Sequence, residues 1–181
     1  MQTRRHTLLA GLGLAGLGLA APGLLAGTAR ADALETRALG FHNLHTGEAL
    51  TIEYWQNGVV PEDAAAAISH VLRDHRTGET HPIDLRLLDL LHALSLQIPS
   101  LRPFQVISGY RSPQTNATLA NASAGVARRS LHMQGMAIDI AVEGVATSTL
   151  RNAALAMNGG GVGYYPDPGF VHIDVGRVRQ W

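Results

Sequence analysis

Residues 136–175, MAIDIAVEGVATSTLRNAALAMNGGGVGYYPDPGFVHIDV, decide the class of fold. The stretch begins with a short apolar run, residues 136–142, that predicts a strand. A helical segment, residues 145–157, follows and is stopped by the glycine-rich run at residues 158–161. Two further strands, joined by a turn at residues 166–169, close the stretch. The sequence therefore places a helix between one predicted strand and a pair of strands joined by a short turn.

The segments that precede residue 136 add a hairpin, a short strand and three helices. Two strand-like runs within residues 37–55 flank a turn, which predicts the hairpin, and the short strand covers residues 104–109. The helices are indicated by leucines at helical spacing or by a proline in the first turn, and they cover residues 61–76, 82–98 and 113–122. Because helices and strands interleave without the regular alternation of a doubly wound sheet, the sequence predicts an α+β fold.

Residues 1–31 have the pattern of an export signal. Arg4 and Arg5 precede a long uncharged segment rich in glycine and alanine, and an Ala-Arg-Ala sequence at its end fits a cleavage site. Paired arginines in this position favour the twin-arginine route, which predicts a periplasmic protein. The alternative is an uncleaved membrane anchor, since residues 7–27 are about long enough to span a bilayer. The many glycines and the Ala-Arg-Ala ending favour cleavage.

The mature chain expected after cleavage, residues 32–181, is one domain that is large enough to bury a sizeable core. It keeps eleven arginines and all fourteen acidic residues, so its net charge is about −3 with histidine neutral. This balance excludes the basic surface of a nucleic-acid binder, and we expect a monomer with no membrane span. Cysteine is absent, so a metal site must be built from histidine and carboxylates.

Polar side chains interrupt two predicted strands that are otherwise apolar. Asp139 lies between small residues on one face of the strand at 136–142. His172 and Asp174 share one face of the strand at 170–175. Burying such groups without partners costs on the order of a few kcal/mol. Two nearby carboxylates would also repel each other unless a cation lay between them.

A zinc ion would resolve this burial, because zinc binds imidazole and carboxylate together and leaves one position open for water. We expect His132, Asp139 and His172 to be the three protein ligands. Zinc in such a shell lowers the pKa of bound water to about 7 and polarises a carbonyl oxygen. The pattern therefore predicts a centre that hydrolyses a peptide or amide bond rather than a purely structural metal site.

Three other residues are candidates for a role beside the metal. Asp174 could orient the imidazole of His172, accept a proton from the metal-bound water, or pair with an arginine such as Arg177. Asp167 is a second candidate base, although aspartate in such a turn is also a common turn former. Arg111 follows a strand on a predicted loop, where it could hold a substrate carboxylate or an oxyanion, or serve only in a structural ion pair.

Three stretches together carry a resemblance to a known superfamily. They are SGYRSP at 108–113, SLHMQGMAIDI at 130–140 and GGVGYYPDPGFVHIDVGRVRQW at 160–181. They resemble the zinc D-Ala-D-Ala peptidase superfamily, which includes lysostaphin-type enzymes and the hedgehog signalling domain, and within it the murein endopeptidase K family. The motif Ser-x-His-x-x-Gly-x-Ala-x-Asp is complete from Ser130 to Asp139. The likeness covers nearly the whole mature chain.

The resemblance implies an exported bacterial zinc enzyme that hydrolyses peptide cross-links involving meso-diaminopimelate in peptidoglycan. Its partners would be the stem peptides, and its fold a small antiparallel sheet with flanking helices. It also implies that zinc is held by His132, Asp139 and His172, with Arg111 facing the substrate.

One position departs from the pattern of the superfamily. Its carboxypeptidases often have a catalytic glutamate three residues before the last ligand, and here that position is Gly169. Asp174 is therefore the expected base, with Asp167 as the alternative. Two other functions stay open: a D-Ala-D-Ala carboxypeptidase, which uses the same zinc chemistry, and a non-catalytic cell-wall binding module, which the missing glutamate allows.

Overall fold

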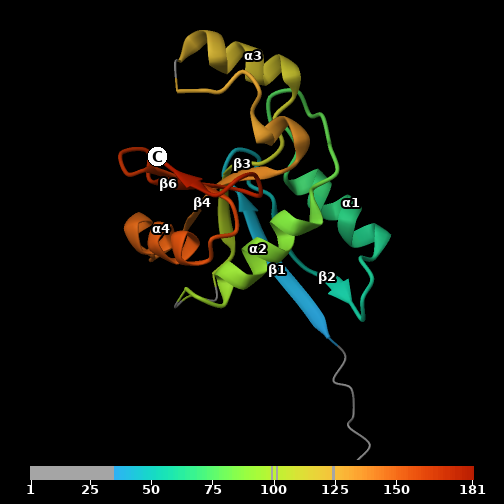
Figure 1. The fold of residues 1–181 in the computed structure, drawn as a ribbon. Helices are drawn as coiled ribbons and strands as arrows, with labels where there is room; N and C mark the ends of the chain where they lie inside the picture. The colour runs from blue at the N-terminus through green and yellow to red at the C-terminus, as the bar shows by residue number, and fades with distance from the viewer. Residues whose placement is uncertain (1–34, 99, 101, 124) are drawn as a thin grey trace, which may run out of the picture. The chain divides into compact units, whose positions relative to one another are not determined.

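One sheet of seven strands organises the part of the chain that the computed structural model describes, residues 35–98, 100, 102–123 and 125–181 (Figure 1). The strands are β1 (Thr36–Asn43), β2 (Ala49–Gln56), β3 (Phe104–Ser108), β4 (Ala137–Val142), β5 (Gly161–Tyr165), β6 (Phe170–Asp174) and β7 (Arg179–Gln180). They lie in the order β2-β1-β3-β4-β6-β5-β7. The expected export signal, residues 1–31, lies outside the described residues and stays a prediction.

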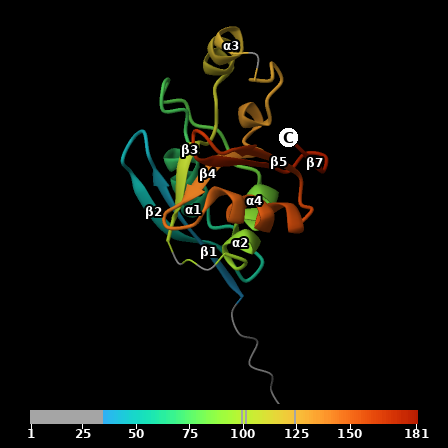
Figure 2. The same cartoon turned by 90° about the vertical axis from the view of Figure 1, so that its left-hand side faces the viewer.

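The helices divide between the two sides of this sheet. They are α1 (Glu62–Val71), α2 (Leu85–Ser95), α3 (Pro113–Ala122), the short 3-10 helix η1 (Leu131–Gln134) and α4 (Thr147–Ala156). Helix α1 packs on β2, α2 on β1, and α4 on β4, β5 and β6. Figures 1 and 2 show α3 and η1 on the opposite side of the central strands. None of the described helices is both long and apolar enough to cross a membrane.

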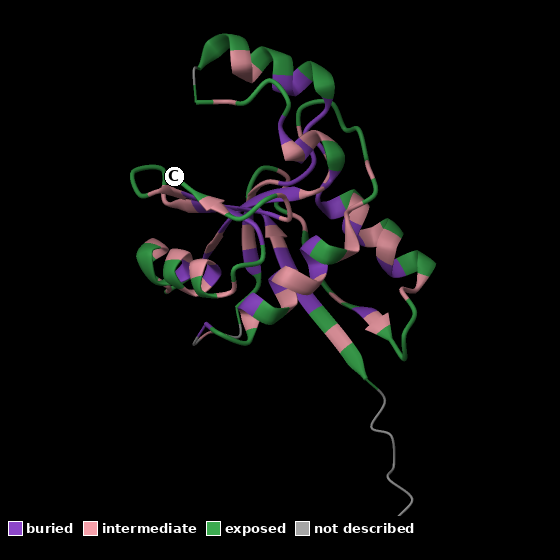
Figure 3. Ribbon diagram, viewed as in Figure 1, coloured by how far each residue is buried: buried purple, intermediate pink, exposed green. Residues whose placement is uncertain are grey.

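The apolar core fills the side of the sheet that α1, α2 and α4 cover. Ile138 and Ile140 of β4 are fully buried and belong to the same hydrophobic cluster as the buried leucines of α2. Figure 3 shows buried residues along the central strands and on the inner faces of these helices. Because side chains alternate along a strand, Asp139 points to the other side, toward η1 and α3. The alternation thus separates a hydrocarbon core from a polar face on the same strands.

The structure confirms most of the predicted elements. The α+β class, the hairpin of β1 and β2, and the helix that begins at Pro113 are all present. Ser112 caps that helix by accepting a hydrogen bond from the backbone N–H of Thr115, which explains why it starts there.

Two expectations are corrected. The sheet is larger than a small antiparallel sheet, and it is mixed, because β1 pairs with β3 and β5 with β7 in parallel. The helix expected over residues 61–76 ends at Val71. It ends because the chain turns into a loop in which Asp74 exchanges backbone hydrogen bonds with Gly78 and Glu79.

Candidate metal centre

The register of β4 and β6 brings two expected ligands together. The strands are antiparallel, and Asp139 lies directly opposite His172. Directly opposed residues project from the same face with their Cβ atoms about 5 Å apart. The two side chains meet there, with Asp139 Oδ1 2.9 Å from His172 Nδ1. Strand pairing therefore creates a contact between residues far apart in the sequence.

The third expected ligand, His132, is positioned by η1. Ser130 caps this turn by accepting a hydrogen bond from the backbone N–H of His132 at 3.4 Å. Gly135 ends the turn in the left-handed conformation, with φ of 64°. A Cβ at Gly135 would collide with the carbonyl oxygen of Pro82. Glycine is therefore required both by the left-handed backbone conformation and by the lack of space for a side chain. Ser130 and Gly135 of the motif thus fix the backbone of the turn and thereby the position of His132.

In each imidazole the nitrogen that points away from the other ligands forms a hydrogen bond with an acceptor oxygen, and this bond sets the tautomer of the ring. His132 Nδ1 is 2.7 Å from the carbonyl oxygen of Gly109. His172 Nε2 is 2.9 Å from Oδ2 of Asp174. Each acceptor oxygen requires a hydrogen on the nitrogen that it faces. In neutral rings the lone pairs therefore lie on His132 Nε2 and His172 Nδ1.

Three lone pairs consequently face one another. His132 Nε2 is 3.1 Å from His172 Nδ1 and 3.3 Å from Asp139 Oδ1, and the three ligand atoms lie within 4.8 Å of one another. Acceptors at these distances repel unless a proton or a metal cation lies between them. Two imidazole nitrogens and one carboxylate oxygen are a ligand set that zinc takes, with a fourth position left for water. The residues therefore fit a metal ion.

The electrostatics of the site follow from burial and from these contacts. Burial raises the pKa of Asp139, but the charge and hydrogen bonds of His132 and His172 outweigh it and hold that pKa well below its usual range. Burial lowers the pKa of His172, whereas hydrogen bonds to Asp139 and Asp174 raise it, and the net direction is upward. A proton and a metal ion thus compete for Nδ1 of His172.

Arg111 reaches the same site from the loop after β3. Its Nη2 donates to Asp139 Oδ2 at 3.3 Å and to Ser108 Oγ at 3.2 Å. Burial lowers the pKa of Arg111, while the charge of Asp139 raises it, and the guanidinium stays protonated. Its Nε is buried and has no hydrogen-bond partner among the described residues. An unused donor on a buried cation suits a ligand oxygen that carries negative charge.

Asp74 holds the loop that carries Arg111, a role that no sequence pattern indicated. Its side chain is buried, and its carboxylate accepts hydrogen bonds from the backbone N–H groups of Ser112 and Arg76, both at 2.9 Å. Burial raises the pKa of Asp74, but the hydrogen bonds that it accepts outweigh burial and hold the pKa below its usual range. The buried carboxylate of Asp74 thus ties the turn that follows α1 to the loop that carries Arg111.

The contacts of Asp174 favour the orienting role over proton transfer. The side chain is fully buried, and it pairs with Arg179 at 2.7 and 3.0 Å, not with Arg177. Two glycine N–H groups and His172 Nε2 also donate to its oxygens. Burial raises the pKa of Asp174, but the hydrogen bonds from His172 and Arg179 outweigh it and lower the pKa. Little acceptor capacity is left for a proton from water.

A cleft of about 450 Å³ opens onto the three ligands. One wall is the loop before η1, and the other is aromatic, with Tyr165 and Trp181. The Trp181 indole lies 5.2 Å from the His172 ring and donates to the Tyr165 hydroxyl at 2.8 Å. Asp167 is exposed on its turn and does not line the cleft. The aromatic wall was not predicted, because aromatic residues at strand ends usually belong to a core.

Comparisons with known proteins point to one family. Residues 31–181 match the family model described as peptidoglycan L,D-endopeptidase MepK. The peptidoglycan L,D-endopeptidase MepK of Escherichia coli strain K12 is 44% identical over 145 residues, which cover 80% of each chain. The probable peptidoglycan L,D-endopeptidase MepK of Haemophilus influenzae is 37% identical over 147 residues, which cover 80% of this chain and 78% of the relative. No solved structure matches the chain.

Proposed function

The chain belongs to the peptidoglycan L,D-endopeptidase MepK family, which makes it a metallopeptidase that hydrolyses peptidoglycan, and we propose that it is a periplasmic zinc enzyme. The proposed reaction is hydrolysis of the peptide cross-links that involve meso-diaminopimelate. The family resemblance seen in the sequence is confirmed by these comparisons. The observation that carries the proposal is the convergence of lone pairs from His132, Asp139 and His172 at the floor of the cleft.

The residues of the chain have distinct roles in this proposal. His132, Asp139 and His172 hold the zinc ion, which when bound supplies a Lewis acid that polarises the scissile carbonyl and activates water. The carbonyl of Gly109 and the carboxylate of Asp174 keep the two imidazoles in the tautomer that presents a lone pair. Ligand geometry is thereby set before any substrate arrives.

Arg111 is the residue that we assign to the substrate. Asp139 and Ser108 hold one end of its guanidinium, and the unused Nε donor is free for an oxygen of the bound peptide. A positioned cation of this kind stabilises a carbonyl oxygen as it gains negative charge, or holds a carboxylate next to the scissile bond. Because the site is buried, that interaction is stronger than it would be in water.

The proposal is tested with purified residues 32–181 and defined cross-linked muropeptides. We expect zinc in the protein, loss of cross-linked dimers on incubation, and no turnover after chelation until zinc is restored. His132→Ala is expected to abolish turnover, whereas His70→Ala, which changes an exposed histidine of α1, is the matched control and should retain it. Full activity in His132→Ala or in zinc-free protein would overturn the proposal.

The same digest separates the two other functions that the sequence allows. A carboxypeptidase would release free alanine and leave the dimers intact. A binding module with structural zinc would retain muropeptides without releasing any product under any metal. The names of the relatives favour the endopeptidase.

A further inference from the structure

Arg129 places a second cationic group at the cleft. It lines the cleft, is exposed, and forms no ion pair with any carboxylate of the described residues. The other two arginines of the lining are engaged, since Arg111 bonds Asp139 and Arg179 bonds Asp174. Both carboxylates of the lining are therefore already neutralised within the protein. Arg129 is therefore the arginine of the cleft wall whose positive charge is not paired with any described side chain.

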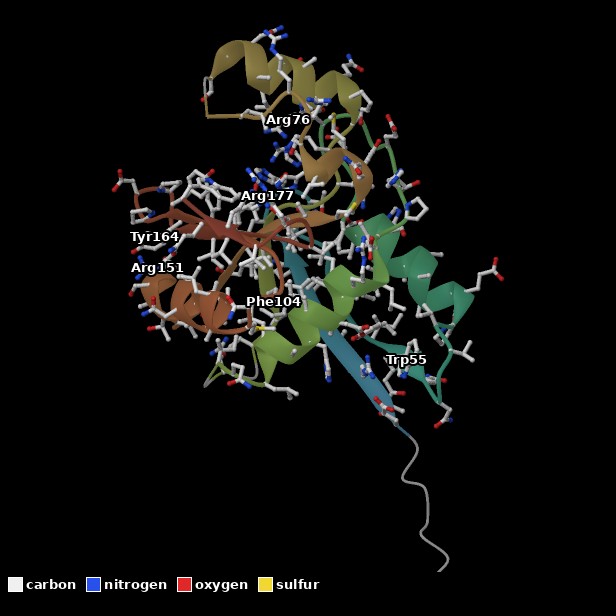
Figure 4. All side chains as sticks on the ribbon, viewed as in Figure 1. Trp55, Arg76, Phe104, Arg151, Tyr164 and Arg177 are labelled. Atoms are coloured by element: carbon white, nitrogen blue, oxygen red, sulfur yellow. The ribbon has the colours of Figure 1, made fainter. Side chains whose placement is uncertain are left out.

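Two further arginines reinforce this charge from neighbouring loops. Figure 4 labels Arg76 and Arg177 on the side of the sheet that carries α3, and neither forms an ion pair with a described carboxylate. Arg76 belongs to the turn that Asp74 ties to the Arg111 loop. The loop of Arg177 runs against η1, because its neighbour Gly176 lies next to Leu131. The side of the sheet that carries the cleft thus holds several arginines that form no ion pair with a described carboxylate.

We propose that Arg129 binds a free carboxylate of the peptidoglycan stem peptide, at a position separate from Arg111. The inference rests on the proposed function, because that function brings stem peptides to the cleft. Stem peptides carry carboxylates on D-glutamate and on diaminopimelate, and a guanidinium binds a carboxylate with two parallel hydrogen bonds. Arg129 lies on the loop before η1 and Arg111 on the loop after β3, so the two cations reach the cleft from different segments of the chain.

The chain offers a matched control one residue away. Arg128 is also exposed and without an ion pair among the described residues, but it does not line the cleft. The loop backbone is fixed independently of both side chains, because Asn116 Nδ2 donates to the carbonyl oxygens of Ala127 and Arg128 at 3.1 Å each. Arg129→Gln and Arg128→Gln therefore make the same change of charge on the same loop without disturbing its path.

The experiment measures calorimetric binding of a monomeric stem tetrapeptide to the zinc-loaded protein. This ligand is a cleavage product, so its affinity is measured without turnover. Arg129→Gln should weaken binding about 3- to 30-fold, as expected for a partly exposed charged hydrogen bond. Arg128→Gln should leave the affinity within about twofold of the unaltered protein, as expected for a surface charge that touches no ligand.

Amidated ligands identify the carboxylate and test the contact itself. Stem peptides are prepared with the D-glutamate or the diaminopimelate carboxylate amidated. If Arg129 contacts one of them, amidating that carboxylate weakens binding to the unaltered protein and removes the difference between it and Arg129→Gln. Such coupling between ligand and side chain reports their direct interaction. Amidation of the other carboxylate should leave that difference unchanged.

The outcomes separate this inference from the proposed function. Equal losses in Arg128→Gln and Arg129→Gln would show general attraction by positive charge, and they would overturn the contact. An unchanged affinity in Arg129→Gln would overturn it as well. If stem peptides bind with the expected coupling but cross-linked dimers are never cut, the proposed function fails while the carboxylate site stands.

Discussion

Replacing Asp174 by asparagine tests whether this carboxylate orients a ligand or accepts a proton. Oδ1 accepts bonds from Arg179 and from two glycine N–H groups, whereas Oδ2 accepts from Arg179 and from His172 Nε2. An amide that keeps its oxygen on the Oδ1 side preserves three of these five hydrogen bonds. Its NH₂ group then faces His172 Nε2 and donates to it. The proton of the imidazole is thereby moved to Nδ1, which is the nitrogen that faces the metal site.

The size of the effect follows from this change of tautomer. For a metal to bind Nδ1 of His172 in Asp174→Asn, the imidazole proton has to return to Nε2. There it faces the NH₂ group of the new amide, so two hydrogen-bond donors oppose each other, which costs about 1–3 kcal/mol. Mutation of a residue that hydrogen-bonds a metal ligand typically weakens metal binding about 10- to 100-fold, which agrees with that range. We therefore expect zinc to bind about 10- to 100-fold more weakly, and activity to recover at saturating zinc.

The assay is a zinc titration of muropeptide hydrolysis combined with a competition measurement of zinc affinity. A proton acceptor behaves differently, because its loss lowers kcat by about 10²- to 10⁴-fold at any zinc concentration. Unchanged zinc affinity together with a low kcat that zinc cannot restore would refute the orienting role. Asp167→Asn is the control, and it should change neither quantity because Asp167 is exposed and outside the cleft.

Three further predictions concern the core, the Arg111 loop and export. Leu91→Ala, at a fully buried position of α2, should lower the free energy of unfolding by about 2–5 kcal/mol in urea titrations, whereas the exposed Leu96→Ala should change it by less than about 0.5 kcal/mol. Asp74→Asn should lower stability at neutral pH. Because the folded pKa of Asp74 is depressed, its contribution is present above the unfolded pKa of about 4 and is lost as the pH falls toward the folded value, so the two proteins should converge in acid. Changing Arg4 and Arg5 to lysine should leave unprocessed precursor in the cytoplasm in cell fractionation, and normal processing would contradict the twin-arginine route.

The three residues that meet at the cleft could be predicted because their chemistry follows from local sequence rules. A carboxylate in an apolar strand and a histidine in another are costly without a partner, and the absence of cysteine leaves few ways to bind zinc. The structure brings His132, Asp139 and His172 together as this reasoning expects. Likewise Ser112 and Pro113 mark the start of α3, because capping involves only neighbouring residues.

The errors arose where distant segments compete. The helix expected to reach residue 76 ends at Val71, because the loop that follows makes its own hydrogen bonds and buries Asp74 under the Arg111 loop. The parallel pairing of β1 with β3 was missed because a strand's sequence carries its alternation but not the identity of its neighbour. The contact between Asp74 and the Arg111 loop and the pairing of β1 with β3 both join segments that are distant in the sequence, so they form only in the folded protein.

By itself the sequence determined the α+β class, the local starts and stops of most elements, and the residue types that can bind a metal. The tertiary structure decided which nitrogen of each histidine faces the site, because Gly109 and Asp174 are brought to the outer nitrogens by packing. It also decided which arginines are engaged and which, like Arg129, are left unpaired at the cleft. Propensities and capping act over a few residues, whereas tautomers and charge pairing depend on neighbours that only the folded sheet supplies.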